Sequence, residues 1–372
     1  MKKLKVLHIY KDYFPVLGGI ENHVRLLCSE LAKDENFQVE VLVTNQGFRT
    51  VVEKEANVRI IKTAWLGKFA STPLSLSLFN WAIKLKPDLI HVHFPYPLGE
   101  LAVLLKGNIE KIVLTYHSDI VKQKRLLSFY RPFLKKILKR AKVIIVSNSK
   151  YIQTSDFLYD YREKIQVIPY GIDLDRFAYR DEKKIGEIKK KYPGPLTLFV
   201  GKLRYYKGLK YLIESAKDVD GKILIVGDGI LKDELEEKIG KDNLKEKVFF
   251  TGEVTEKELS SFYQAADIFV LPSSHKSEAF GISILEAMAS GLPVISTELG
   301  TGTSFVNLNN KTGLVIPPRD SVALSQAINY LLKNKSLREE FGKVGRERAQ
   351  KYFHKELMVS RIKKLYIDVL KD

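Results

Sequence analysis

The chain has 372 residues, which exceeds the length of one small core and predicts two domains of ordinary size. Its one cysteine, Cys28, excludes an intrachain disulfide framework and indicates a reducing compartment. The net charge of +17 favours an anionic partner, which leaves nucleic acid, a phosphorylated small molecule or an acidic membrane surface as candidates.

The first half of the chain predicts a parallel sheet. Apolar, β-rich runs alternate there with helical patterns, which is typical of strands covered by helices on both faces. The first run ends at Lys11 and Asp12, so we interpret residues 2–10 as a strand and not as a secretion signal. The predicted strands span residues 5–9, 39–43, 58–61, 89–92, 112–115, 143–146 and 165–168. Residues 44–75 show no pattern that predicts their structure.

A glycine pair follows the first predicted strand. Ligands collect beyond the carboxyl ends of parallel strands, so the loops at those ends are candidate binding segments. Gly18 and Gly19 open a predicted helix there and would let a ligand approach backbone amides. A plain tight turn is the alternative interpretation of this pair.

The histidines of this half are candidate site residues or core residues. His117 follows the strand 112–115 and is the favoured functional candidate, whereas His8 lies inside a strand and is interpreted as a core residue. We expect His91 and His93 to point to opposite faces of their strand, and the sequence therefore predicts no metal site.

Residues 122–140 form a basic amphipathic segment. They contain eight Lys and Arg residues and no acidic residue, interleaved with leucine, isoleucine and aromatic side chains. This composition predicts a helix that lies on an anionic membrane surface, and a charged face over an ordinary core helix is the alternative. Nucleic acid is not expected as a partner because no recognised binding motif accompanies the charge. No apolar run reaches the roughly 20 residues that cross a bilayer, so we expect a cytoplasmic protein.

A second α/β pattern follows a turn-rich segment. We place the linker in residues 169–195, which are rich in turn residues and charges, and the domain boundary after residue 176. The second domain is predicted to span residues 177–354, and a C-terminal helix of about 355–372 is expected to pack back on the first domain, residues 1–176. The predicted strands of the second domain are 196–200, 223–226, 248–250, 268–271, 294–296 and 313–316. The sequence therefore predicts a second doubly wound sheet.

A cationic loop follows the strand 196–200. Lys202, Arg204 and Lys207 lie between two glycines at a strand-to-helix junction, which predicts a cradle for a diphosphate. A solvated turn is the alternative. Gly227, in a Gly-Asp-Gly sequence after the strand 223–226, is a weaker candidate that turn or cap chemistry also explains. The glycine-rich loop 300–303 would supply further backbone donors.

Two glutamates bracket the loop and helix after the strand 268–271. Glu286 repeats with Ile282, Leu285 and Ala289 on the apolar stripe of a predicted helix, where a carboxylate is rarely left without a partner. Glu278 lies in the preceding loop, so the pair could hold opposite ends of a ligand about 10 Å long, with the helix N-terminus between them. A sugar, a diphosphate and a ribose together fit that description.

These residues resemble the retaining GT-B glycosyltransferases of family four, also called group 1 glycosyltransferases, and within them a bacterial polysaccharide mannosyltransferase group. The resemblance spans nearly the whole chain and is strongest at four segments. They are Gly18-Gly19, residues 169–173, residues 202–208, and Glu278 to Glu286 with Ala287 and Gly291. It implies an α/β protein of two Rossmann-like parallel-sheet domains that face a cleft, with the nucleotide-sugar held mainly by the second domain.

The resemblance also implies roles for single residues. Glu278 would bind donor-sugar hydroxyls and Glu286 the ribose hydroxyls, while Lys202 and Lys207 would neutralise the leaving diphosphate. His117 would lie near the donor sugar. The remaining donor-binding positions are Gly18, Gly19, Arg204, Gly227, Ala279, Phe280, Gly281 and Ile282. Many relatives have arginine at the position of Lys202, which puts bidentate phosphate binding there in question, and Arg204 could compensate.

The predicted function is retaining transfer of a hexose to a saccharide linked to a polyprenyl diphosphate, at the inner membrane face, in cell-surface polysaccharide synthesis. Mannose from GDP-mannose is the expected donor, and UDP-glucose, UDP-galactose or UDP-N-acetylglucosamine is the alternative. No cofactor and no metal are expected, since fixed cations can stabilise the leaving diphosphate. A dinucleotide oxidoreductase is disfavoured because Gly-x-Gly-x-x-Gly is absent after both domain-opening strands. A non-catalytic protein that binds polyanions or membranes remains the alternative from another class.

Overall fold

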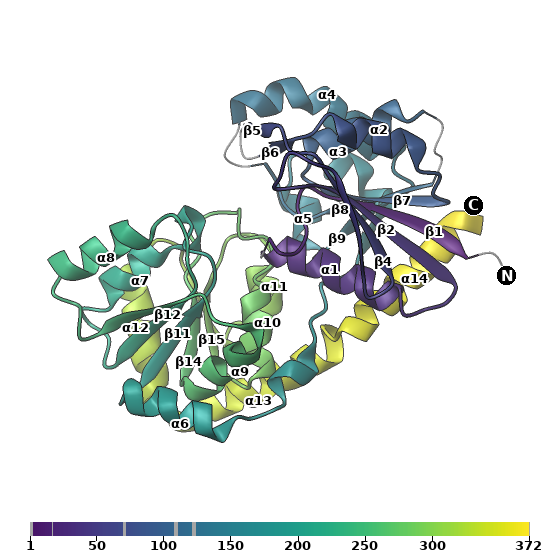
Figure 1. Ribbon diagram of the computed structural model, residues 1–372. Coiled ribbons are helices and arrows are strands. Elements are labelled where there is room, and N and C mark those ends of the chain that lie inside the picture. The colour runs from purple at the N-terminus through teal and green to yellow at the C-terminus, as the bar shows by residue number, and fades with distance from the viewer. Residues whose placement is uncertain (1–2, 17, 70–71, 108–110, 121–123, 372) are drawn as a thin grey trace. The chain divides into compact units, whose positions relative to one another are not determined.

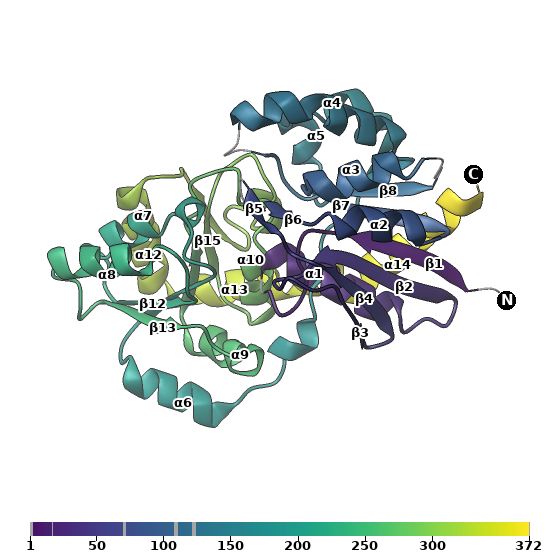
Figure 2. The same cartoon turned by 45° about the horizontal axis from the view of Figure 1, so that its top comes forward.

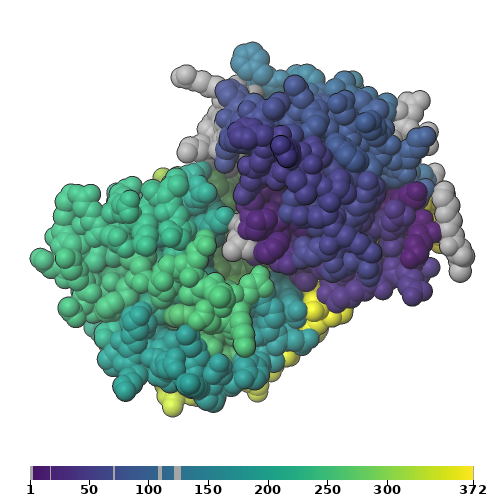
Figure 3. Space-filling view, viewed as in Figure 1, coloured from purple at the N-terminus to yellow at the C-terminus, as the bar shows by residue number. Residues whose placement is uncertain are grey.

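The computed structural model of the protein describes residues 3–16, 18–69, 72–107, 111–120 and 124–371. The chain divides into two compact units, one of residues 1–171 with 355–372 and one of residues 172–354 (Figure 1). The boundary expected after residue 176 lies a few residues inside the second unit. In the space-filling view each unit is a closely packed body (Figure 3).

The first unit is built on one sheet of strand order β10-β9-β8-β7-β1-β2-β4-β3. All pairings are parallel except that of β3 with β4. A separate antiparallel hairpin, β5 with β6, follows β4. The strands are β1 (Leu4–Ile9), β2 (Phe37–Thr44), β3 (Val51–Glu55), β4 (Val58–Thr63), β5 (Gly67–Phe69), β6 (Thr72–Leu74), β7 (Leu89–Phe94), β8 (Ile112–Tyr116), β9 (Val143–Val146) and β10 (Ile165–Val167).

Helices cover both faces of this sheet. In Figure 2, α2, α3 and α4 lie on one face, and the views of Figures 1 and 2 place α1 beside α14 on the other. Connections between parallel strands are right-handed, so the direction in which the chain crosses the sheet decides which face a helix covers. From β1 the chain proceeds to β2 and β4, and from β7 it proceeds the opposite way to β8, β9 and β10, so the helices of the two halves cover opposite faces. The helices are α1 (Gly19–Leu31), α2 (Ser77–Lys84), α3 (Pro97–Leu105), α4 (Lys124–Arg140), α5 (Lys150–Thr154), the 3₁₀ helix η1 (Tyr159–Lys164) and α14 (Lys355–Lys371).

The C-terminal helix α14 belongs to the first unit although 183 residues of the second unit separate it from that unit's other elements. The ammonium of Lys363 lies 2.8 Å from the carboxylate of Asp34, and the hydroxyl of Tyr366 lies 2.5 Å from Nδ1 of His91 on β7. Lys111 donates to the carbonyl oxygen of Val369. These contacts tie the last helix to the sheet and to the residues after α1.

The second unit is built on a parallel sheet of strand order β13-β12-β11-β14-β15-β16. Its strands are β11 (Leu196–Val200), β12 (Lys222–Val226), β13 (Val248–Gly252), β14 (Ile268–Leu271), β15 (Val294–Thr297) and β16 (Gly313–Ile316). Its helices are η2 (Leu174–Phe177), α6 (Glu182–Lys191), η3 (Tyr205–Lys207), α7 (Leu209–Ser215), α8 (Lys232–Lys241), α9 (Glu256–Ala265), α10 (Ile282–Ala289), α11 (Thr303–Val306), α12 (Ser321–Lys333) and α13 (Lys335–Tyr352). Two Rossmann-like parallel-sheet units therefore make up the α/β fold, as predicted.

The strand order reverses direction once in each sheet. In the first unit the reversal lies between β1 and β7, and in the second it lies between β11 and β14. The loops that leave two such neighbouring strands diverge to opposite faces and open a crevice between them, which is where ligands bind in open α/β sheets. Each unit therefore has its candidate ligand-binding edge at its own reversal.

Part of the expected linker is a helix of the second unit. The charged stretch 182–191 forms α6, whose N-cap Asp181 accepts a hydrogen bond from the amide of Lys184 at 3.0 Å. Ile185 and Ile188 are buried against the unit, so the segment packs although few of its residues are apolar. No helix in the described ranges combines the length and the apolar character that a membrane span requires.

Candidate functional site

Two loops meet where the second sheet reverses direction. The loop after β11 contains Gly201 to Gly208, and the loop after β14 runs from Pro272 to Gly281. The amide of Ser274 donates to the carbonyl oxygen of Tyr206 at 2.7 Å. Gly208 has a φ of +72°, and a Cβ there would lie 1.9 Å from the carbonyl oxygen of Pro272, so only glycine permits this approach.

An ion pair joins the two loops. The ammonium of Lys207 lies 2.6 Å from Oε2 of Glu278, and both side chains are about one-tenth exposed. The hydroxyl of Ser273 donates to the same oxygen at 3.1 Å. Burial lowers the pKa of Lys207, but the carboxylate of Glu278 and the phenol of Tyr206 more than offset burial, so the net pKa lies above its ordinary value. Lys207 is therefore a fixed cation in the crevice.

The side chains of the other two cations of the loop differ from that of Lys207. In the described part of the chain, the side chains of Lys202 and Arg204 make no hydrogen bond and no ion pair. Both are half-buried. The loop after β11 thus carries three cations, and two of them make no ion pair with the described residues.

Glu286 has the partner that its position on the apolar stripe requires. Its Oε2 accepts a hydrogen bond from the hydroxyl of Tyr263 on α9 at 2.7 Å. Burial raises the pKa of Glu286, and the hydroxyl of Tyr263 and the guanidinium of Arg176 oppose this rise. The other carboxylate oxygen, Oε1, has no partner among the described residues, and the same holds for Oε1 of Glu278. Each glutamate therefore keeps one oxygen for a ligand.

The N-terminus of α10 lies between the two glutamates in the chain. Gly281 caps this helix with a φ of +83°, and Phe280 is buried. The loop 300–303 contacts this segment through two hydrogen bonds. The amide of Gly302 donates to the backbone carbonyl oxygen of Ala279 at 2.8 Å, and the hydroxyl of Thr301 donates to the backbone carbonyl oxygen of Glu278 at 2.7 Å. The loop thus holds residues 278–281 in place, and the amide of Gly302 is already used.

Gly227 positions the loop after β12 beside the cationic loop. Its amide donates to the carbonyl oxygen of Gly252 at 2.9 Å. Its φ is +130°, and a Cβ there would lie 2.2 Å from the carbonyl oxygen of Gly201. Any larger residue would push the two loops apart.

In the first unit, Gly18 and Gly19 begin α1 after the strand β1. Gly18 is the N-cap, and its carbonyl oxygen accepts from the amide of Asn22 at 2.9 Å. A Cβ at Gly18 would lie 2.1 Å from Oε2 of Glu21. The carboxylate of Glu21 therefore lies against Gly18, at the N-terminus of α1.

His117 lies at the carboxyl end of β8 and is fully buried. Its Nε2 is 3.0 Å from Nδ1 of His93, and its Nδ1 is 2.5 Å from the hydroxyl of Tyr170. The expectation that His91 and His93 point to opposite faces is wrong, since their rings stack with centroids 4.3 Å apart. Side chains two residues apart in a strand share a face. The sequence signal of this histidine cluster was the His-x-His pattern on β7.

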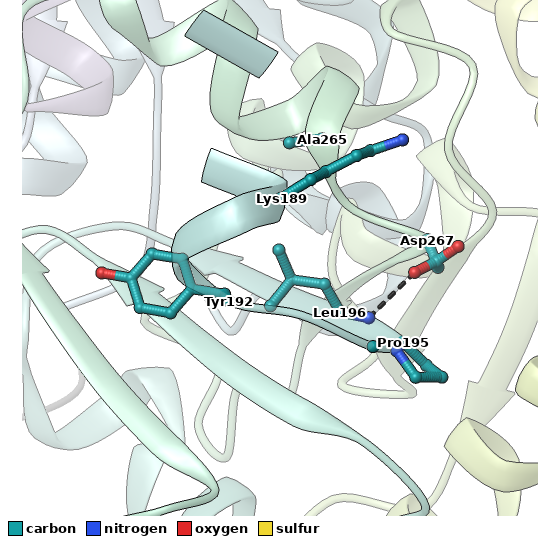
Figure 4. A pocket seen from close by; sticks show the side chains of 7 residues that line it. Lys189, Tyr192, Pro195, Leu196, Ala265 and Asp267 are labelled. Atoms are coloured by element: carbon teal, nitrogen blue, oxygen red, sulfur yellow. Dashed lines mark hydrogen bonds between the residues drawn. The ribbon is translucent and has the colours of Figure 1, made fainter. Parts of the chain in front are cut away.

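A cavity of about 280 Å³ elsewhere in the second unit does not have the features of the predicted site. Figure 4 shows its lining, where the amide of Leu196 donates to Asp267 at 2.8 Å. Leu196 begins β11, so the cavity lies at the amino end of that strand, opposite the edge where ligands collect.

Two family descriptions match the chain, one on each half. Residues 17–176 match "Glycosyltransferase Family 4", and residues 180–348 match "Glycosyl transferases group 1". The chain belongs to the group 1 glycosyltransferases. The predicted family is thereby confirmed, and each match falls almost wholly within one unit of the fold.

Two bacterial relatives of this group 1 glycosyltransferase cover nearly its full length. The D-rhamnosyltransferase WbpZ of Pseudomonas aeruginosa is 36% identical over 94% of this chain and 92% of its own. The O-antigen chain mannosyltransferase C of Escherichia coli is 34% identical over 99% of both chains. Among solved structures, sucrose-phosphate synthase of Thermosynechococcus elongatus has a TM-score of 0.85 at 24% identity, covering 99% of this chain and all of that one. The protein is a glycosyltransferase of the GT-B fold.

Proposed function

We propose that this glycosyltransferase moves a hexose, with retention of anomeric configuration, from a nucleotide-sugar to a lipid-linked saccharide in cell-surface polysaccharide synthesis. The observation that carries the proposal is the crevice at the reversal of the second sheet. There Lys207 and Glu278 are paired, and the side chains of Lys202 and Arg204 form no ion pair with any residue that the structure describes. Cations and free carboxylate oxygens side by side suit a ligand that has both phosphates and hydroxyls.

The cations would act on the leaving diphosphate. Cleavage of the sugar-phosphate bond builds negative charge on the diphosphate and positive charge on the anomeric carbon. Lys202, Arg204 and Lys207, with the amides at the start of α10, would stabilise the first of these charges without reorganising. These groups supply the positive charge that a divalent ion would otherwise bring, so we propose that transfer requires no metal.

The glutamates would hold the neutral ends of the donor. A carboxylate repels phosphate but accepts hydrogen bonds from hydroxyls, so Oε1 of Glu278 would bind the sugar and Oε1 of Glu286 the ribose. Lys207 and Tyr263 fix the other oxygen of each carboxylate. We assign neither glutamate as a nucleophile. A donor phosphate oxygen would take the acceptor proton on the same face of the sugar, which gives retention.

His117 is proposed to lie near the donor sugar. Its two ring nitrogens are engaged by His93 and Tyr170, so a sugar hydroxyl would have to displace one of these partners to bind the imidazole. Gly18 and Gly19 are proposed to let the diphosphate approach the first unit.

The names of the relatives favour mannose as the transferred sugar. One relative is a mannosyltransferase of O-antigen chains and another a D-rhamnosyltransferase, a transferase of a 6-deoxy sugar of the manno configuration. GDP-mannose is therefore the proposed donor, and a UDP-hexose is the alternative. A non-catalytic polyanion-binding or membrane-binding protein is disfavoured, because it leaves the partnered Glu286 without a role.

The acceptor would be reached at the inner membrane face through α4. Of the predicted segment 122–140, residues 122 and 123 lie outside the described residues. Phe129 is 81% exposed and Phe133, one turn later, is 46% exposed. Exposed cations surround them at Arg131, Lys135, Lys136 and Lys139. Aromatic side chains between cations are typical of a helix that lies on anionic lipid.

A donor screen tests the function. Purified protein is incubated with GDP-mannose, UDP-glucose, UDP-galactose and UDP-N-acetylglucosamine and with polyprenyl-diphosphate-linked saccharides, and the anomeric configuration of any product is read by NMR. We expect an α-linked mannosyl product with GDP-mannose. Glu278→Ala and Glu286→Ala should abolish it, whereas Glu246→Ala, an exposed residue on the same unit, should not. The absence of any glycosidic product with every donor would refute the proposal.

A further inference from the structure

Five buried histidines lie together in the first unit, and the proposed transfer uses only one of them. They are His8 on β1, His23 on α1, His91 and His93 on β7, and His117 directly after β8, and none is more than 5% exposed. Burial lowers the pKa of His8 and of His23 to about 3 and lowers the pKa of the other three well below the ordinary value. Five imidazoles this close together are candidate metal ligands, and their geometry decides which of them can share an ion.

One triad of this cluster has the spacing of a metal site. Ligand atoms of His23, His93 and His117 all lie within 4.8 Å of one another. Nδ1 of His93 and Nε2 of His117 are 3.0 Å apart. Two nitrogens bound to one tetrahedral zinc ion at about 2.0–2.1 Å are separated by roughly 3.3 Å. A shift of a few tenths of an ångström would therefore admit the ion between them.

The outer nitrogens of these two rings already have suitable partners. Nδ1 of His117 lies 2.5 Å from the hydroxyl of Tyr170, and Nε2 of His93 lies 3.0 Å from Nδ1 of His8. A histidine that binds a metal through one nitrogen donates its other N–H to such a partner, which fixes the tautomer and the ring orientation. Both rings can therefore hold their single proton on the side away from the triad.

His23 supplies the observation that points most directly to a ligand. Its ring makes no hydrogen bond in the described part of the chain, and its Nδ1 is buried without a partner. The ring centroid lies 5.5 Å from that of His117 and 6.3 Å from that of His93. An unsatisfied buried polar group destabilises a fold, so a partner is expected here.

The second triad, of His8, His91 and His93, is less suited to a metal although its ligand atoms are equally close. Both nitrogens of His91 are engaged, Nδ1 with the hydroxyl of Tyr366 at 2.5 Å and Nε2 with that of Thr115 at 2.6 Å. No nitrogen of His91 is left for an ion. The hydrogen bonds of the cluster thus select one triad.

We propose that the first unit binds one divalent transition-metal ion through His23, His93 and His117. Zn²⁺ suits three neutral imidazoles, with a water or hydroxide at the fourth position, and a hydroxide would offset part of the ion's charge in this buried setting. The site lies at the reversal of the first sheet, between β7 and the start of α1. The site shares His117 with the proposed transfer site, and its test therefore measures the uptake of an ion and not turnover.

Metal uptake is measured directly on full-length protein that carries no polyhistidine tag. The protein is treated with a chelator, desalted, and titrated with ZnCl₂ by calorimetry and with CoCl₂ by visible absorption. We expect one ion per chain and the intense visible bands of tetrahedral Co²⁺. Failure to take up either ion in stoichiometric amount would overturn the proposal.

Three variants locate the ion. His23→Gln removes the third ligand but leaves the hydrogen bonds of His93 and His117 in place, so Zn²⁺ affinity should fall at least 100-fold. Tyr170→Phe removes an outer partner and should lower affinity by roughly 10- to 100-fold. His354→Gln, a half-buried histidine of the second unit, is the control and should bind as the wild type does. Circular dichroism of the metal-free variants checks folding, and wild-type affinity in folded His23→Gln would contradict the site.

Discussion

The ammonium of Lys207 and the carboxylate of Glu278 lie 2.6 Å apart and join the two loops at the reversal of the second sheet. The pair combines a residue proposed to bind phosphate with one proposed to bind the sugar. Donor binding would therefore place the leaving diphosphate and the sugar hydroxyls on two groups that already hold each other in position. This preorganisation is the physical basis of the proposed catalysis.

Variants of Lys207 and Glu278 should show that this ion pair contributes separately to catalysis and to stability. Lys207→Met leaves the buried carboxylate of Glu278 unpaired, so the free energy of unfolding should fall by about 3 kcal/mol. The double variant Lys207→Met with Glu278→Gln should recover most of that loss but no turnover. Urea denaturation and kcat together check this. Recovery of turnover in the double variant would contradict the assigned roles.

Removing the hydroxyl of Tyr263 should affect donor binding and not the chemical step. Tyr263→Phe leaves Oε2 of Glu286 without its hydrogen bond, so the carboxylate is no longer held for the ribose. Loss of a hydrogen bond to a charged group is worth about 1.5–3 kcal/mol, so we expect the donor KM to rise roughly 10- to 100-fold with kcat little changed. Steady-state kinetics with varied donor checks this. An equal fall in kcat at unchanged KM would assign Tyr263 to the transition state instead.

Glu100 should make the stability of the protein depend on pH. This residue of α3 is fully buried, its Oε1 accepts from the amide of Tyr96 at 2.7 Å, and its Oε2 has no partner among the residues with described positions. Burial raises its pKa from 4.5 to about 8, so the folded state holds a proton that the unfolded state releases above about pH 4.5. Stability is therefore lost as the pH rises through this interval, by about 1.4 kcal/mol for each unit of pKa difference.

The variant Glu100→Gln tests this dependence. Its amide oxygen can still accept from Tyr96, but the side chain does not titrate. We expect the stability of the wild type relative to this variant to decline between pH 5 and pH 8, as measured by urea denaturation at each pH. Parallel stability curves for the two proteins would show that Glu100 keeps an ordinary pKa.

Metal removal should leave transfer intact. Lys202, Arg204 and Lys207 are proposed to balance the charge of the diphosphate, so turnover in excess EDTA should match turnover without the chelator. The same assay with added Mg²⁺ or Mn²⁺ is the control. A loss of activity in EDTA that Mg²⁺ or Mn²⁺ restores would show that the cations do not suffice.

Binding to anionic lipid should depend on the exposed aromatic residues of α4. Phe129→Ser with Phe133→Ser should reduce co-sedimentation with phosphatidylglycerol vesicles several-fold, because the variant lacks the two rings that would be buried in the lipid. Phe48→Ser, at a residue 77% exposed elsewhere on the first unit, is the matched control. Raising the salt concentration should weaken binding further, as expected for a basic surface. Equal losses for both variants would remove α4 from the contact.

The strands could be predicted from the sequence because buried parallel strands appear as continuous apolar runs. The strand β3 could not, since it is an exposed antiparallel edge whose Val51 and Val52 are 42% and 48% exposed. The sequence of α6 resembles a linker, because Ile185 and Ile188 are its buried residues and the others are mostly charged. Apolar sequence patterns reflect the burial of side chains, so they do not predict an element that has few buried apolar side chains.

The candidate site could be predicted as a set of residue types but not as a set of contacts. The cationic loop and the two glutamates stand out in the sequence because each departs from its local pattern. The pairing of Lys207 with Glu278 and of Tyr263 with Glu286 joins residues far apart in the chain, which no local pattern contains. The histidine cluster does not follow from the expectation that His91 and His93 point to opposite faces, because side chains two residues apart on β7 share a face.

Calorimetry with two ligands and two variants tests the central claim most directly. The ligands are GDP and GDP-mannose, or the uridine pair if the donor screen selects it, and the variants are Glu278→Gln and Glu286→Gln. If Glu286 binds the ribose and Glu278 the sugar, Glu286→Gln should weaken both ligands by a similar factor, whereas Glu278→Gln should weaken only the nucleotide-sugar. Loss of GDP affinity in Glu278→Gln, or unchanged affinity for both ligands in Glu286→Gln, would contradict the account.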